Sequence, residues 1–154
     1  MDRDPRRIGP LGWLGLVFVL ACGGDGPTAM FPGGPLTSGE WIEETEVDWS
    51  FASEIEEIEL QSGGSSRTTW IAVIGEQAFV PCSLEFPPFK TWHEDALTDP
   101  SAVVRVGGKR YRRTLQKVED AQLQAELEAL VEEKYGGSPG DGGVWFFLLA
   151  SPAG

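Results

Sequence analysis

The feature that most constrains the fold is a pair of short β-type segments whose two faces are both apolar. Residues 67–74 and 77–82 flank Gly75-Glu76, a Gly-X turn signal that predicts a hairpin. One face would carry Trp70, Ala72, Ile74 and Phe79, and the other Ile71, Val73, Ala78 and Val80. Since a solvated sheet face would be polar, we expect a barrel interior against one face and a helix or second subunit against the other.

Four further stretches predict strands. A half-buried strand is expected at about 54–61, where apolar residues alternate with glutamates. Residues 102–106 and 109–118 flank Gly107-Gly108, which predicts a second hairpin because both glycines can take positive φ. Residues 144–149 are six consecutive apolar residues, which is typical of a buried central or barrel strand.

Two helices are expected between these strands. Thr91 and Glu94 have the spacing of a capping box, which predicts a short helix that Asp99-Pro100 ends. Asp120 is expected to cap a longer helix that stops at Gly136-Gly137. Its apolar positions at helical spacing are Leu123, Leu127, Leu130, Val131 and Tyr135. The fold predicted for residues 40–150 is therefore mainly β, a small closed barrel with two helices.

The first 21 residues have the form of an export signal. Arginines precede an apolar run of nine residues, 13–21, whereas a membrane-spanning helix needs roughly 20. The sequence Val19-Leu20-Ala21-Cys22-Gly23 resembles the bacterial lipobox, whose cysteine is diacylated and becomes the new N-terminus. We therefore expect a protein of the bacterial cell envelope, anchored to a membrane through lipid on Cys22. The alternative is an ordinary secretory signal in which Cys22 is incidental.

Residues 22–39 are expected to form a flexible tether. Six glycines and three prolines lie between residues 23 and 39, and no apolar periodicity is present. The backbone entropy lost on ordering this segment is therefore predicted to exceed the free energy gained by burying it. Lipidation of Cys22 would leave Cys82 unpaired, and a disulfide between the two is the alternative.

The charge balance excludes some classes of partner and site. Twelve Lys and Arg against 24 Asp and Glu give a net charge of −12, which repels nucleic acid phosphates, so no nucleic acid partner is expected. One histidine and two cysteines are too few for a closed zinc site, which needs four such ligands, so no metal site is expected.

Several motifs, taken together in order and spacing, resemble one family. They are Ile58-Glu59-Leu60, Arg67-Thr68-Thr69-Trp70, Lys90-Thr91-Trp92, Asp99-Pro100, 103–109, Val118-Glu119-Asp120 and 144–148. This pattern is similar to that of the split-barrel flavin-binding superfamily, which includes pyridoxamine 5′-phosphate oxidase-like proteins and deazaflavin-dependent nitroreductases. The resemblance implies a six-stranded Greek-key split barrel that forms a homodimer and holds FMN or F420 between subunits.

The resemblance also implies a set of cofactor-binding residues. Its phosphate ligands would be Arg67, Thr68, Thr69 and Lys90, with free backbone amides where a helix opens at Thr91 and Trp92, and the ring of Trp70 or Trp92 would line the pocket. No catalytic side chain is assigned, because in this family the cofactor performs the chemistry. Two functions stay open: a noncatalytic binding or structural lipoprotein, which we favour, and an FMN- or F420-dependent oxidoreductase acting on quinone-like or nitro substrates.

Arginines of the second hairpin need an anion. A two-residue turn places Arg105 directly opposite Arg110, with Arg112 on the same face, and like charges so paired are destabilising. Either a ligand phosphate or carboxylates of the chain could relieve the repulsion, and we favour the carboxylates. The candidates are Glu54, Glu56, Glu57 and Glu59.

The remaining candidate residues are predicted to be structural. His93, at the second position of a short helix, is expected to be a surface or interface histidine. Cys82 is expected in the core, where a free cysteine behaves as a small apolar side chain. Trp41, Trp49 and Phe51 are expected on the barrel or at the dimer seam.

Overall fold

The computed structural model describes residues 25–28, 31–137 and 142–152, and over these residues the protein is mainly β with two α-helices, as the sequence predicts. In chain order the elements are β1 (Glu40–Ile42), the 3-10 helix η1 (Trp49–Ala52), β2 (Glu57–Ser62), β3 (Ser65–Trp70), β4 (Ala72–Ile74), β5 (Gln77–Ser83), α1 (Trp92–Thr98), β6 (Ser101–Val106), β7 (Lys109–Lys117), α2 (Ala121–Tyr135) and β8 (Val144–Ala150).

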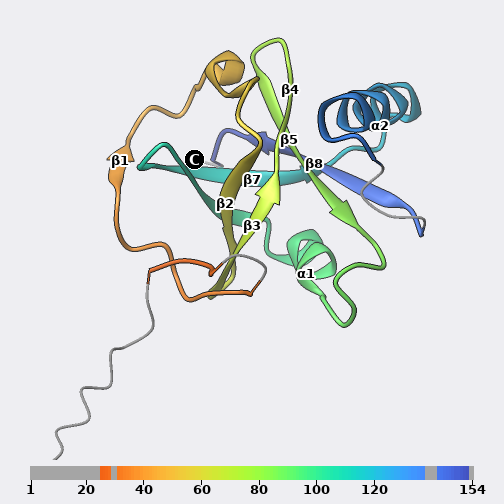
Figure 1. Ribbon diagram of the computed structural model, residues 1–154. Helices are drawn as coiled ribbons and strands as arrows, with labels where there is room; N and C mark the ends of the chain where they lie inside the picture. Colours follow the sequence, from red (N-terminus) through yellow and green to blue (C-terminus); the bar gives the residue numbers. More distant parts are fainter. Residues whose placement is uncertain (1–24, 29–30, 138–141, 153–154) are drawn as a thin grey trace, which may run out of the picture.

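The strands form one curved sheet. Its order is β3-β2-β6-β7-β8-β5-β4, with antiparallel neighbours throughout, and β1 pairs in parallel with β7. The two strands at the ends of this order, β3 and β4, are separated in the chain only by Ile71. The chain itself therefore links the two edges, and the sheet bends into a half-barrel (Figure 1).

Both faces of β5 and β8 are buried, as the apolar hairpin predicts. The faces divide as expected: Ile71, Val73, Ala78 and Val80 pack in the cluster inside the half-barrel, and Trp70, Ala72, Ile74 and Phe79 in a second cluster outside it. The outer cluster includes Leu127 and Val131, so helix α2 is the cover of this face. Neighbouring residues Phe146 and Phe147 enter opposite clusters, and both are 0% exposed.

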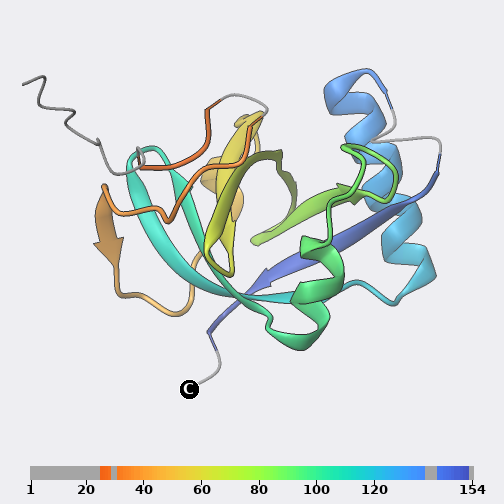
Figure 2. The same ribbon diagram turned by 90° about the horizontal axis from the view of Figure 1, so that it is seen from below.

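Two short helices lie at the ends of the half-barrel. Trp49 of η1 and Trp92 of α1 both belong to the inner cluster. Figure 1 shows η1 and α1 at opposite ends and α2 along the flank, and Figure 2 views the molecule from the α1 end. The inner core is therefore covered at both ends.

Helix boundaries agree with the sequence signals, but one cap differs. The Oδ1 of Asp120 accepts a 2.7 Å hydrogen bond from Leu123 N, and α2 ends at Gly136 with φ 72°. Thr91 stands at the start of α1, yet its hydroxyl donates to Asp95 Oδ2 at 3.0 Å and makes no capping bond. The predicted capping box is therefore wrong in its contacts, because a side chain within α1 binds the threonine.

The described part of the expected tether is packed on the sheet. Leu36 is 3% exposed and its N–H donates to Gln61 Oε1. Gly33 and Ser66 exchange two backbone hydrogen bonds, of 2.9 and 3.0 Å. A Cβ on Gly33 would lie 1.8 Å from the carbonyl oxygen of Gly26. The prediction of a flexible tether is wrong for these residues, because their glycines permit close backbone approach rather than mobility. The predicted signal of residues 1–21 and Cys22 lie outside the described residues.

Candidate functional site

The arginines of the β6–β7 hairpin are neutralised within the chain. Arg105 lies opposite Arg110, as predicted. Its guanidinium binds Glu59, with Nε to Oε2 at 2.5 Å, and Asp25, with Nη1 to Oδ2 at 2.7 Å. Glu59 is one of the carboxylates expected for this role. Asp25 was not expected, because it lies in the segment whose composition indicates a tether.

The charges at this ion-pair centre reinforce one another. Hydrogen bonds from Ser38, Thr37 and Arg105 hold the pKa of Asp25 well below its ordinary value. The hydrogen bond to Glu59 raises the pKa of Arg105 further above its already high value. Arg110 donates to the carbonyl oxygens of Gly39 and Leu36 and, like Arg112, stacks on the ring of Trp41, with both guanidinium carbons 4.2 Å from its centroid. Arg105, Arg110 and Arg112 therefore bind groups within the chain and leave few free donors for a ligand.

The predicted cofactor ligands divide between two faces of β3. Arg67 and Thr69 alternate with Thr68 and Trp70, so the first pair shares the face of Ile71 and the second the face toward α2. The Trp70 ring stacks on Tyr135, with centroids 4.2 Å apart and planes 3° apart. The structure therefore separates Thr68 and Trp70 from the rest of the predicted set.

Arg67, Lys90 and Trp92 are brought together beside α1. The guanidinium carbon of Arg67 lies 4.9 Å from the Trp92 ring centroid. Lys90 Nζ donates to the carbonyl oxygen of Phe86, and Thr91 lies between Lys90 and the helix. Cys82, at the end of β5, is close enough to interact electrostatically with both cations. We call Arg67, Lys90 and Trp92 the α1 cluster.

The two cations of the α1 cluster are poorly compensated. Burial lowers the pKa of Arg67, and burial together with nearby Arg67 lowers the pKa of Lys90. Arg67 Nε is buried without a hydrogen-bond partner among the described residues, and no carboxylate of these residues forms an ion pair with either cation. Cys82 and, more weakly, Asp95 are the acidic groups that act against this lowering of the Arg67 pKa. Arg67 Nη2 donates only a long hydrogen bond, of 3.5 Å, to the carbonyl oxygen of Ser65. Because both cations are half-buried and lack an ion pair, this arrangement favours an anion from outside the chain.

His93 adjoins this cluster and is buried. Its side chain is 7% exposed, its ring lies 5.2 Å from that of Trp145, and its Nδ1 has no partner among the described residues. Burial lowers its pKa, so the imidazole is neutral at pH 7. The expectation of a surface or interface histidine is wrong, because α1 turns Trp92, His93 and Ala96 toward the half-barrel.

Cys82 is a core residue, as expected. It is 2% exposed, and burial raises the pKa of its thiol to about 11. We predict that in a Cys22→Ser variant the native protein reacts with a thiol reagent at pH 8 about a hundredfold more slowly than the urea-unfolded protein. Absorbance at the reagent's product wavelength measures both rates, and equal rates would contradict this burial.

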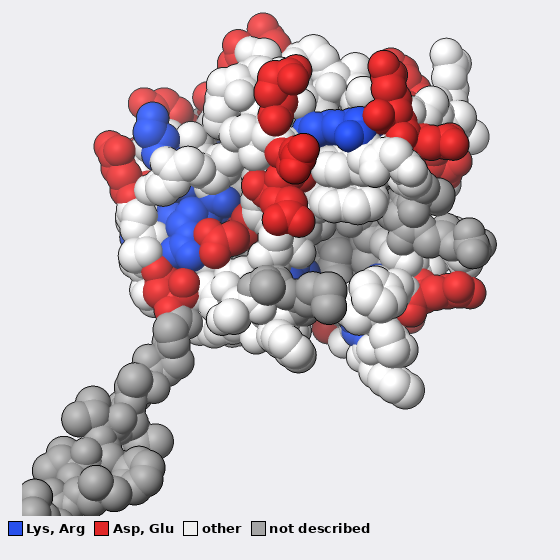
Figure 3. All heavy atoms as spheres, viewed as in Figure 1, with Lys and Arg blue, Asp and Glu red and all other residues white. Residues whose placement is uncertain are grey.

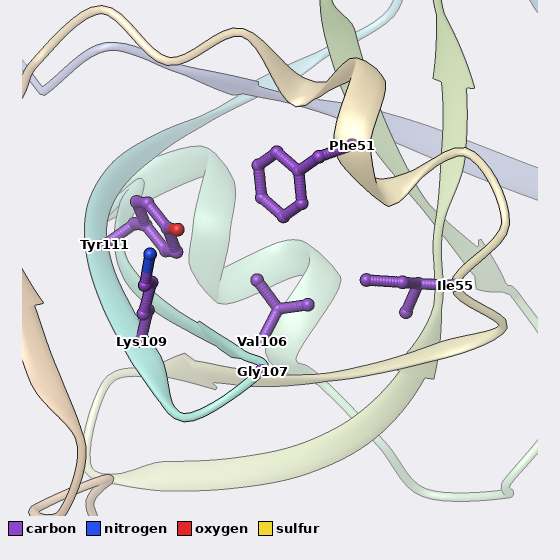
Figure 4. A pocket seen from close by; sticks show the side chains of 6 residues that line it. All are labelled: Phe51, Ile55, Val106, Gly107, Lys109 and Tyr111. Atoms are coloured by element: carbon purple, nitrogen blue, oxygen red, sulfur yellow. The ribbon is translucent and has the colours of Figure 1, made fainter.

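Two surface hollows among the described residues lie apart from the α1 cluster. One, of about 250 Å³, is at the η1 end, where Phe51 faces Lys109 and Tyr111 (Figure 4). Another, of about 390 Å³, is lined in part by Asp99, Arg112 and Arg113. Neither includes a predicted cofactor ligand. Of the early aromatic residues, Trp49 is in the core and Phe51 stacks on it at 5.7 Å.

The α1 cluster fits part of a flavin cofactor but not all of it. Arg67 and Lys90 suit a phosphate, since a guanidinium can donate two parallel hydrogen bonds to it. For the ring system, Trp70 is engaged by Tyr135, and neither of the two hollows described above adjoins the α1 cluster. Within one chain the predicted residues therefore fit an anion and not a complete flavin.

Comparison with models of known families, with curated proteins and with solved structures finds no match for this chain. Among the described residues no helix is long and apolar enough to cross a membrane. The same residues contain no group of three or more His, Cys, Asp or Glu side chains placed to hold a metal ion.

Proposed function

We propose that the protein is a bacterial envelope lipoprotein, anchored through Cys22, whose split-barrel domain binds an anionic ligand at the α1 cluster without catalysing a reaction. The observation that carries the ligand-binding role is Arg67 Nε, buried and unpartnered beside Lys90. In a chain of net charge −12, two adjacent half-buried cations without an ion pair are unfavourable unless an anion joins them.

The strand order supports the split-barrel interpretation. If β3 and β4 are counted as one bent strand, the order becomes a circle of six: β3/β4, β2, β6, β7, β8 and β5. The return from β5 to β6 through α1 crosses over two neighbouring strands, as a Greek key requires. This topology supports the six-stranded Greek-key barrel that the resemblance implies.

The alternative is an FMN- or F420-dependent oxidoreductase. It is favoured by one observation, that Arg67 and Lys90 meet where the resemblance implies a phosphate site. A second copy of the chain would then have to supply the walls around the flavin ring, which makes a homodimer necessary to this alternative. The flavin would carry the hydride, and this chain's residues would hold the phosphate.

Ligand stabilisation distinguishes the two functions. The chain from Gly23 onward is unfolded thermally with inorganic phosphate, FMN or F420, and a ligand at 100 times its Kd should add about 2.7 kcal/mol. We expect a colourless protein that phosphate stabilises at least as well as either cofactor. Arg67→Met and Lys90→Met should abolish the effect, while Arg112→Met, a matched exposed arginine, should retain it.

Two results would count against this proposal. A yellow purified protein that FMN stabilises far more than phosphate would establish the redox alternative. Absence of stabilisation by any of these anions, or equal stabilisation of the Arg67→Met variant, would overturn the binding role.

The anchor is tested separately. Cells expressing the full chain are supplied with radioactive palmitate, and the protein should incorporate it and sediment with membranes. Cys22→Ser should lose both properties. If neither the full chain nor the Cys22→Ser variant incorporates palmitate, and both are secreted in soluble form, Cys22 is incidental.

A further inference from the structure

Exposed aromatic side chains gather at one end of the molecule. The described residues contain five exposed large hydrophobic side chains, Phe31, Phe51, Phe86, Phe89 and Leu97. Phe51 lies on η1, and Leu97 lies on α1 at the opposite end (Figure 1). Phe86 and Phe89 belong to the segment that leads into α1. Figure 3 shows uncharged side chains projecting along the lower edge of the view, below separate patches of acidic side chains.

Phe31 belongs to the same end. It lies two residues before Gly33, which pairs with Ser66 at the start of β3. The next residue of β3, Arg67, covers Trp92 of α1. Both the N-terminal segment and the segment before α1 therefore adjoin the start of β3, and Figure 2, viewed from this end, shows both. We call Phe31, Phe86, Phe89 and Leu97 the aromatic end.

Phe89 holds a conformation that packing among the described residues does not explain. Its φ is 66°, the left-handed region that a bulky residue rarely adopts, and its side chain is 100% exposed. Strained backbone of this kind is found where it serves a contact. No residue of the described part of the chain covers the ring, so packing among those residues leaves it free for a contact.

The N-terminal attachment indicates how close a membrane would lie to the barrel. Asp25 is held by Arg105 at 2.7 Å, and Cys22 lies only three residues earlier. Three residues span about 10 Å when fully extended. Because the segment after Asp25 is packed on the sheet, a lipid on Cys22 would hold the barrel against the bilayer rather than at the end of a tether.

We propose that the aromatic end rests on the membrane surface, with Phe86 and Phe89 inserted at the lipid interface as a second attachment beside the Cys22 lipid. This inference rests on the proposed lipidation. Apolar side chains add to a lipid anchor because membrane affinity grows with buried apolar area. Exposed Glu85, Glu94 and Asp95 lie in the same segments, so a zwitterionic lipid surface suits this end better than an anionic one.

The test replaces the natural anchor with an artificial one. The chain from Gly23 carries an N-terminal hexahistidine tag and is attached to phosphatidylcholine vesicles containing a nickel-chelating lipid. A polarity-sensitive fluorophore is placed on Phe89→Cys, with the matched control on Glu76→Cys, an exposed site in the β4–β5 turn at the η1 end. Buried Cys82 does not compete for the label.

We expect the label at residue 89 to shift to the blue on tethering and to be quenched by brominated lipid, while the label at residue 76 stays in water. Untagged protein should bind vesicles weakly, and Phe86→Ser with Phe89→Ser should lower that binding about tenfold or more.

Three outcomes would overturn the inference. Both labels could remain in water on tethered protein. Both could enter the lipid equally, which would mean that no end is preferred. The label at residue 89 could already be blue-shifted without vesicles in a protein that sediments as a dimer, which would assign the aromatic end to a second copy. None of these depends on natural lipidation, because the tether is artificial.

Discussion

Replacing Phe146 or Phe147 by Ala is expected to lower the free energy of unfolding by about 3–5 kcal/mol in each case. The two neighbours point to opposite faces of β8, and both are 0% exposed. Truncating either leaves a cavity, one inside the half-barrel and one beneath α2. Urea unfolding of each variant, followed by tryptophan fluorescence, measures the loss.

A sheet with one solvated face would give a different result. One of the two substitutions would then be nearly neutral, since exposed substitutions usually stay within about 0.5 kcal/mol. Gln116→Ala, at an exposed site on β7 paired with β8, serves as the control and should fall in that range. Unequal losses of this kind would contradict burial of both faces.

Arg105→Met is expected to cost about 2–4 kcal/mol of stability, because it leaves Glu59 and Asp25 without their shared cation. It should also free the N-terminal segment, so limited proteolysis should cut between residues 25 and 39 in the variant but not in the native protein. Arg112→Met, whose side chain is half exposed and pairs weakly with Glu43, should change neither property.

The carboxylate of Asp25, whose pKa is lowered by hydrogen bonds from Ser38, Thr37 and Arg105, makes stability depend on pH. The pKa of Asp25 is lowered in the folded protein, so its contribution is present above the unfolded pKa of about 3.9 and is lost as pH falls below it. Native protein should therefore lose stability below about pH 4 more steeply than Arg105→Met does. Parallel pH profiles for the two proteins would show that the pairing contributes nothing.

The strand pattern could be predicted because local signals and long-range packing agree there. Alternation around Gly75-Glu76 gives the two faces of the β4–β5 hairpin, and Gly107 and Gly108 take the positive φ that a two-residue turn requires. Asp120 and Gly136 bound α2 as capping residues should. The Arg105–Arg110 pairing follows from the same register, and its need for a carboxylate follows from charge alone.

The features that the sequence did not predict depend on tertiary contacts. Leu36 is a single apolar residue among glycines and prolines, so nothing local marks it as buried. His93 is buried because α1 docks on the end of the half-barrel, which its helical position does not reveal. From the sequence, Trp70 fits both the lining of a cofactor pocket and the core, and only its stacking on Tyr135 in the structure distinguishes the two roles. The ion pair of Asp25 was also missed. Its signal was an acidic residue with no basic residue near it in the sequence, which implies a partner from elsewhere in the fold.

The most direct test of the account is the Nε–Hε resonance of Arg67 in a phosphate titration followed by nuclear magnetic resonance. Because Arg67 Nε is buried and unpartnered among the described residues, a bound anion should accept its hydrogen bond and move the resonance saturably. The resonance of exposed Arg112 should move little and without saturation. An Arg67 resonance that stays in place while the protein is saturated with phosphate would contradict the anion site beside α1, and with it the proposed function.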